Sequence, residues 1–185
     1  MHRLIVLLIT LLSAVNVGSA CTEMVTASSP AARIAVIFVQ SQHFTDVRYS
    51  KAEPNSIALL DELHTFMCTL GERYIPAGMQ LEIKVTDIDL AGDFEPWHGP
   101  QFVHVRITRA IYRPRISLEF RLTDGSGSVI SAGQREISDI DYQERFVGPP
   151  DDYLRYEKAL LHEWFRHEFG DIKTTPALQR SGGLP

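Results

Sequence analysis

The sequence predicts an α+β protein, a two-layer sandwich with two helices packed on one face of a mixed, mostly antiparallel five-stranded sheet. Two observations lead to this class. Apolar residues recur at helical spacing in two separate segments, and the remaining ordered segments are alternating or continuously apolar, as strands are. The order is β-α-β-β-β-β-α, so the first two strands, joined through a helix, are expected to be parallel neighbours with a right-handed crossover. Two amphipathic helices and one half-solvated sheet then make two layers.

The first strand is expected at residues 33–39 (RIAVIFV), a continuous apolar run suited to the middle of a sheet. A polar loop follows. Asn55 or Ser56 can cap the first helix, which is expected to run to about Tyr74. Its core stripe comprises Leu59, Leu60, Leu63, Phe66, Met67 and Leu70.

The second strand begins near residue 78, with Leu81, Ile83 and Val85 on one face, and its alternation carries Asp87 onto that same apolar face. Three antiparallel strands are expected to follow, at residues 102–111, 115–122 and 128–140. In the first of them, Arg109 continues the apolar face of Val103, Val105 and Ile107. A charge in register with a core is ordinarily part of a buried or rim ion-pair network.

Asp151 and Asp152 are expected to cap the second helix, which runs to about Phe169. The core stripe of this helix comprises Leu154, Leu161, Trp164, Phe165 and Phe169. Glu157 lies on the same stripe, where the pattern expects no charge.

The N-terminal residues predict the compartment. A short charged start at His2 and Arg3, an apolar run over residues 4–12 and small residues before Cys21 are typical of a bacterial secretory signal. The domain organisation expected is a signal peptide at 1–20, a flexible leader arm at 21–32, a single domain at 33–169 and a mobile tail at 170–185. The mature protein is expected to be periplasmic, and no second apolar run is long enough to cross a bilayer.

The chain has two cysteines, and their fates exclude each other. Ordinary cleavage after Ala20 would leave Cys21 free to form a disulfide with Cys68 across the flexible arm. Alternatively, Cys21 directly after the cleavage site could be lipidated, which would make the protein an outer-membrane lipoprotein and leave Cys68 free. Gly18, at the position where a lipobox normally has Leu, favours ordinary cleavage.

Residues 78–97 (GMQLEIKVTDIDLAGDFEPW) are the most informative stretch for function. Four carboxylates lie within nine positions, and an aromatic side chain follows them. If the first two strands are parallel, the loops after both strands open at the same edge of the sheet. The residues expected to form a binding surface there, in addition to Thr45, are Asp46, Arg48, Asp87, Asp89, Asp93, Glu95 and Trp97. Asp87 is expected on the core side, and Asp93 and Glu95 in solvent.

Several site chemistries are disfavoured by spacing. His162 and His167 are five residues apart, about 140° around a helix, so they cannot share one zinc ion as an i, i+4 pair does. The run after Asp87 resembles the start of a calcium loop, but His98 stands where the bidentate Glu is required. No Gly-x-Ser-x-Gly elbow is present. Neither a catalytic residue nor a metal ligand nor a cofactor is therefore assigned.

Three segments carry a family resemblance: FTDVR at 44–48, TDIDLAGDFEPW at 86–97 and RYEKALLHEWFRHEF at 155–169. With them the chain resembles the DUF3016 family of secreted bacterial proteins, a domain of unknown function, over nearly the whole domain. The resemblance implies a periplasmic or envelope setting and no activity.

Two functions of different class remain. The first is a non-catalytic envelope protein whose acidic loop surface binds an envelope protein or a small ligand. The alternative is a hydrolase or a divalent-cation-binding protein that uses the carboxylates of residues 87–95, with Asp87 and Asp89 as an acid–base pair. The net charge is −5 and no basic stripe is visible, which disfavours nucleic acid as a partner.

Overall fold

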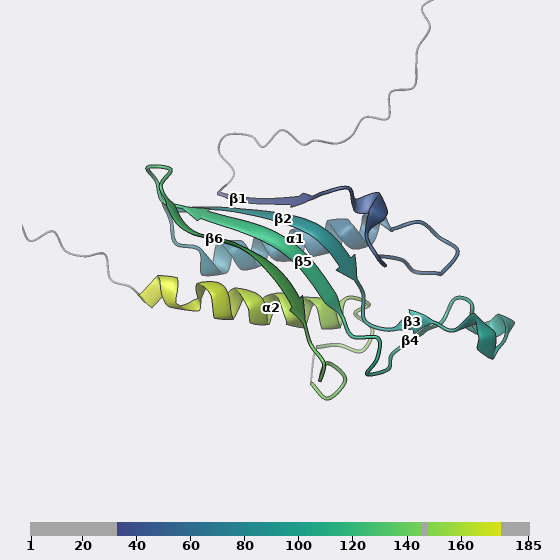
Figure 1. Ribbon diagram of the computed structural model, residues 1–185. Helices are drawn as coiled ribbons and strands as arrows, with labels where there is room; N and C mark the ends of the chain where they lie inside the picture. Colours follow the sequence, from purple (N-terminus) through teal and green to yellow (C-terminus); the bar gives the residue numbers. More distant parts are fainter. Residues whose placement is uncertain (1–32, 146–147, 175–185) are drawn as a thin grey trace, which may run out of the picture.

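Four strands form the central sheet, and two helices pack on one of its faces (Figure 1). The computed structural model describes residues 33–145 and 148–174. The sheet has the order β1-β2-β5-β6. Its strands are β1 (Ile34–Phe38), β2 (Gln80–Asp89), β5 (Arg115–Thr123) and β6 (Val129–Ser138). β1 is parallel to β2 and the other two pairings are antiparallel, so the α+β class and the mixed sheet are confirmed.

The two helices begin and end close to the predicted positions. α1 (Ile57–Tyr74) is capped by Ser56, whose side chain accepts a hydrogen bond from the Leu59 backbone N–H. α2 (Arg155–Phe169) begins a turn later than predicted, although Asp152 still accepts a hydrogen bond from the Leu154 backbone N–H at 2.9 Å. Both helices bury the predicted stripes against the sheet, except for Phe66 of α1, which is only partly buried.

The core lies between the helices and the sheet and is rich in aromatic rings at its α2 side. Phe120 of β5 packs edge-on against Trp164 and Phe169 of α2, with ring centroids 5.9 and 5.6 Å apart. Such pairs add to the stabilisation that burial of their area supplies. Glu157 also lies in this buried stripe, as its position in the helical pattern predicted.

The prediction of a fifth strand at residues 102–111 is wrong. These residues belong to an arm that projects from the sheet (Figure 1), built on the short pair β3 (Asp93–Phe94) and β4 (Arg106–Ile107). Between them lie two single-turn 3₁₀ helices, η2 (Pro96–His98) and η3 (Pro100–Phe102). Their prolines cannot donate to a strand ladder, and Val105, counted as a core position, is 46% exposed. We call residues 93–107 the projecting arm.

The place predicted for the first strand is also wrong. β1 was expected in the middle of the sheet because its residues are apolar on both faces. In the structure it lies at an edge, and in the described part of the chain β2 is the strand that pairs with it (Figure 1).

The predicted signal peptide (1–20), leader arm (21–32) and residues 175–185 lie outside the described residues, as does Cys21. A short 3₁₀ helix, η4 (Gly170–Thr174), follows α2 directly. Among the helices of the described residues, none has the length and hydropathy needed to cross a membrane.

Candidate functional site

The loop after β1 meets the end of β2 at one edge of the sheet, as the parallel pairing predicted. Asp46 forms an isolated parallel bridge with Asp89. Its backbone N–H donates to the Ile88 carbonyl at 2.9 Å, and its carbonyl accepts from the Leu90 N–H at 3.1 Å. This bridge holds the predicted residues Asp46, Arg48, Asp87 and Asp89 around the same edge. We call the charged residues gathered there the polar rim; they are Asp46, Arg48, Lys51, Asp87, Asp89, Asp93, Arg106, Arg113 and Arg115.

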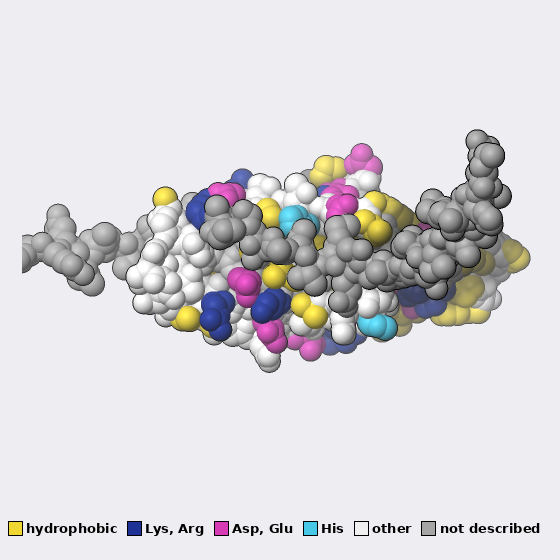
Figure 2. All heavy atoms as spheres, turned by 90° about the horizontal axis from the view of Figure 1, so that it is seen from above, with side chains coloured by type: hydrophobic (Ala, Val, Ile, Leu, Met, Phe, Trp, Pro, Cys, Tyr) yellow, Lys and Arg dark blue, Asp and Glu magenta, His cyan; other side chains and the backbone are white. Residues whose placement is uncertain are grey.

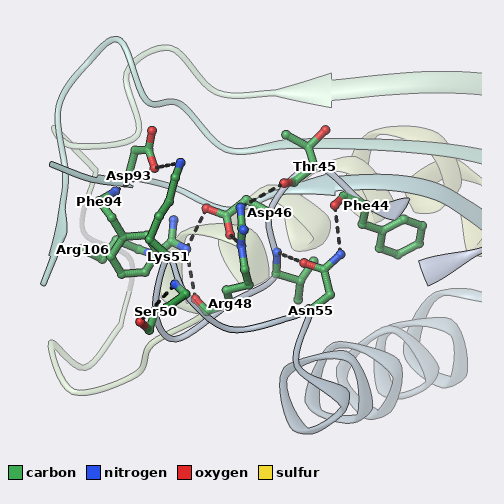
Figure 3. A network of polar contacts seen from close by, with 12 residues as sticks. Phe44, Thr45, Asp46, Arg48, Ser50, Lys51, Asn55, Asp93, Phe94 and Arg106 are labelled. Carbon is green, nitrogen blue, oxygen red and sulfur yellow. Dashed lines mark hydrogen bonds and ion pairs between the residues drawn. The ribbon is translucent and has the colours of Figure 1, made fainter. Parts of the chain in front are cut away.

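A buried ion pair between Asp46 and Arg106 is the centre of the polar rim (Figure 3). Arg106 Nη2 lies 2.9 Å from Asp46 Oδ2, and Arg48 Nε lies 3.0 Å from the other carboxylate oxygen. Burial disfavours the charged guanidinium, but Asp46 and Tyr153 outweigh that effect and raise the pKa of Arg106 above its ordinary value. The Arg106 guanidinium therefore keeps its charge although it is buried.

Arg106 also ties the projecting arm to the body of the protein. Its Nη1 donates to the Gly92 carbonyl at 2.7 Å, its Nε lies 2.9 Å from Tyr153 Oη, and its guanidinium stacks over the Phe94 ring at 4.6 Å. Sequence reasoning missed Arg106 and Tyr153. The alternation of residues 102–111 made Arg106 the outward residue of a strand, and no local signal connects it to Asp46, sixty positions away.

Asp87 does not lie on the core face, contrary to the prediction. The pairing of β2 with β5 shifts register between Val85 and Asp87, a β-bulge that moves the apolar face onto Ile88 and Leu90. The half-buried Asp87 carboxylate instead accepts hydrogen bonds from the backbone N–H and the hydroxyl of Thr45, at 2.7 and 2.8 Å. Asp87 thus fastens the loop after β1 to β2.

Two more predicted carboxylates line the polar rim, each with a cationic partner. Asp89 accepts from Arg115 Nη2 at 2.8 Å, and Asp93 lies 3.4 Å from Lys51 Nζ. Burial raises the pKa of Asp89, and Arg115 partly opposes that rise. The Asp93 side chain is 33% exposed, so the prediction that Asp93 points to solvent is confirmed only in part.

Glu95 is buried, although the sequence placed it in solvent. Its side chain is 2% exposed and accepts from Arg109 Nη2 at 2.7 Å and from Tyr112 Oη at 3.0 Å. His98 Nε2 lies 2.8 Å from the same carboxylate. Glu95 therefore stabilises the base of the projecting arm. Trp97 lies farther along the arm, 68% exposed, and does not join the polar rim.

Glu157, like Asp46 and Glu95, is a buried carboxylate, and it contacts the backbone next to the polar rim. Glu157 of α2 accepts a hydrogen bond from the Ala91 backbone N–H at 2.6 Å, while its other oxygen, Oε2, is buried and has no hydrogen-bond partner in the described part of the chain. Burial raises the pKa of this carboxyl to about 7. Glu157 is therefore bound to backbone, and it forms no ion pair with the described residues.

A groove of about 600 Å³ opens at the polar rim. Asp46, Asp89 and Asp93 line it, and each of them is held by an intramolecular cation. Arg113 also lines it, and among the described residues this exposed guanidinium has no ion-pair partner. The apolar part of the lining includes Leu90, Ile111 and Ile140.

The charges on the face shown in Figure 2 are mixed. On the face shown in Figure 2, basic and acidic side chains lie next to one another rather than in separate patches. Among the described residues, no group of three or more His, Cys, Asp or Glu side chains has the arrangement to hold a metal ion. His162 lies against Tyr74, with 3.4 Å between Nε2 and the hydroxyl, whereas His167 is exposed.

Comparison with known proteins adds a family but no activity. The sequence model of a family described as "Protein of unknown function (DUF3016)" matches residues 32–167. No curated protein matches the chain. A crystal structure of a minor lipoprotein from Acinetobacter baumannii is similar over 76% of this chain and 91% of that one, with 9% identity and a TM-score of 0.28. A TM-score of this size is below that of a shared fold, so the similarity carries no conclusion about this chain.

Proposed function

Because this chain belongs to the DUF3016 family of proteins of unknown function, we propose its function from the polar rim: it is a non-catalytic binding protein that takes an anionic ligand in the groove. The observation that carries the proposal is the difference between the charges that line the groove. Its carboxylates are already paired within the molecule, whereas Arg113 is exposed and has no ion-pair partner among the described residues. The charge available to a ligand is therefore positive, although the sequence of the loop is acidic.

The groove also supports a ligand with an apolar part. Ile111 and Ile140 are 75% and 64% exposed and line the groove. Exposed aliphatic side chains beside a guanidinium suit a ligand that offers a carboxylate or phosphate next to apolar atoms, because both contacts are then formed in one site. Lys51, half exposed and at 3.4 Å from Asp93, adds a second cation that a ligand can recruit.

Acid–base chemistry has less support at this site. Asp87 accepts two hydrogen bonds from Thr45, and Asp89 is held by Arg115, so neither carboxylate is left free as a general base. The raised pKa of Asp89 is the one feature that favours the hydrolase alternative, and burial is its main cause.

The proposed setting is the periplasm or the cell envelope. It rests on the secretory signal that the sequence predicts at residues 1–20, which lie outside the described residues. The expectations of a single domain at 33–169 and of an envelope partner are part of the same proposal.

Thermal denaturation with charged peptides tests the proposal. A tetraglutamate peptide should raise the melting temperature of the protein, because a ligand that binds the native state stabilises it by mass action. A tetralysine peptide at the same concentration should not. The Arg113→Gln variant should lose most of the shift while keeping the melting temperature of the free protein, since Arg113 is exposed and pairs with no carboxylate of the described residues.

Arg121→Gln is the matched control. Arg121 is an exposed arginine of β5, outside the groove lining, so its loss should leave the tetraglutamate shift unchanged. A larger shift with tetralysine would contradict the proposal, as would a tetraglutamate shift that Arg113→Gln and Arg121→Gln reduce equally.

A further inference from the structure

The outer edge of β1 offers backbone groups to a further strand. The Arg33 carbonyl accepts from the Leu81 N–H, and the Val39 N–H donates to the Val85 carbonyl, both at 2.9 Å. Backbone groups of successive residues in a strand point to opposite sides, so residues of the other parity point away from β2. These outward residues are Ile34, Val36 and Phe38. In the described part of the chain no strand pairs with them.

This edge lacks the features that usually prevent edge-to-edge pairing. Exposed edges are typically guarded by charges, prolines or bulges. Residues 34–39 contain no charge and no proline, and the register of β1 on β2 is continuous. The opposite edge, β6, is guarded: Arg135 pairs with Glu168 of α2, and the register on β5 shifts near Thr123. The two edges of one sheet therefore differ, and β1 is the one open to pairing.

The helix below β1 continues the same uncharged surface. Ile57, His64, Cys68 and Gly71 recur at spacings of seven, four and three, one stripe of α1. The stripe borders β1, since a Cβ on Gly71 would lie 2.7 Å from the Ile34 side chain and the rings of His64 and Phe38 lie 6.4 Å apart. Ile57 is 74% exposed. These four positions are uncharged, but Asp61 lies beside them on the same face of α1, and Glu72 borders them in an ion pair with Arg33.

We propose that β1 pairs in an antiparallel manner with β1 of a second copy of this chain, about a two-fold axis through Val36, so that two sheets become one. In this register Val36 faces Val36 and Ile34 faces Phe38 of the other copy. All three residues have outward backbone groups, so each pair exchanges two hydrogen bonds. Their side chains all point to the helix side, so both helix layers lie on the same face of the joined sheet.

A second copy fits this edge because the edge is complementary to itself. An isologous contact places each residue near a residue of the same surface, so a charged edge would face like charges. Residues 34–39 of the β1 edge are free of such charges, and their side chains on the core side are apolar. Pairing would cover Phe38, which is only half-buried in the single copy.

Sedimentation velocity across a wide protein concentration range tests the proposal on the full secreted chain. The wild type should be a dimer at high concentration. Ile37 points to the open face of the sheet and lies diagonally across the two-fold axis from Ile37 of the other copy. Ile37→Lys and Ile37→Glu should each raise the dissociation constant at least about tenfold, because each brings like charges together. An equimolar mixture of the two variants should dimerise again.

Gln134→Lys on β6 is the matched control, since it adds a charge to the same open face at the other edge and should leave the dimer unchanged. Circular dichroism should show that all variants fold. A wild type that stays monomeric at every concentration would overturn the proposal. This holds regardless of whether residues upstream of β1 or a different protein then pair with its edge. A dimer that both Ile37 variants leave intact would overturn it too, because the interface would then lie elsewhere.

Discussion

Glu157 is the residue whose environment is least like that of an ordinary carboxylate. It is 1% exposed, one oxygen has no hydrogen-bond partner, and its pKa is raised from 4.5 to about 7. The folded protein therefore binds this proton more tightly than the unfolded chain does. The stability that Glu157 contributes is fully present below pH 4.5 and is lost as the pH rises through 7.

The Glu157→Gln variant should remove this pH dependence. The amide oxygen of Gln still accepts the hydrogen bond from Ala91, and it carries no charge at any pH. The free energy of unfolding of the wild type relative to this variant should fall by about 3 kcal/mol between pH 4.5 and pH 8. Urea denaturation of both proteins at several pH values measures the difference. A difference that stays constant with pH would show that folding does not raise the pKa of Glu157.

At the scale of the element, the projecting arm depends on the tight turn at Gly92. This glycine has φ of +82°, a conformation that L residues with a side chain rarely adopt, and its carbonyl accepts from Arg106. A Cβ at this position would lie 2.9 Å from the Ile107 carbonyl oxygen. The turn from β2 into the projecting arm therefore requires a glycine at position 92.

Gly92→Ala should cost more stability than Gly127→Ala. Gly127 has nearly the same backbone angle, φ +86°, but a Cβ there would contact nothing within 4 Å. Gly127→Ala should cost about 1 to 2 kcal/mol from conformation alone. Gly92→Ala should cost a further ~1 to 3 kcal/mol from the close approach of the arm. Chemical denaturation gives both values, and equal losses would mean that the arm moves freely to admit a side chain.

At the scale of the whole molecule, the fate of Cys21 decides whether the protein, for which we propose an envelope location, carries a lipid anchor. Cys68 is half-buried on α1, and burial raises the pKa of its thiol. The intact mass of the secreted protein should match cleavage after Ala20 without a lipid. Cys68 should then resist a thiol reagent under denaturing conditions because a disulfide to Cys21 protects it. A diacyl adduct together with a labelled Cys68 would establish the lipoprotein instead.

The sequence by itself determined the α+β class, both helices, the parallel pair and the edge at which Asp46, Arg48, Asp87 and Asp89 meet. Each of these follows from local periodicity, helix capping and the geometry of a crossover, which depend on neighbouring residues. The buried position of Glu157 was also visible, because helical spacing alone places it on the stripe of Leu161 and Phe165.

Only the tertiary structure decided which carboxylate pairs with which basic side chain. A bulge of one residue turned Asp87 off the core face, and residues 102–111, which alternate like a strand, contribute the short strand β4 to the projecting arm instead of a strand to the central sheet. That arm brings Arg106 to Asp46 and Arg109 to Glu95, across sixty and fourteen positions of the chain. An ion pair depends on distances in space, so the acidic loop of the sequence became a rim of paired charges, in which Arg113 has no ion-pair partner among the described residues.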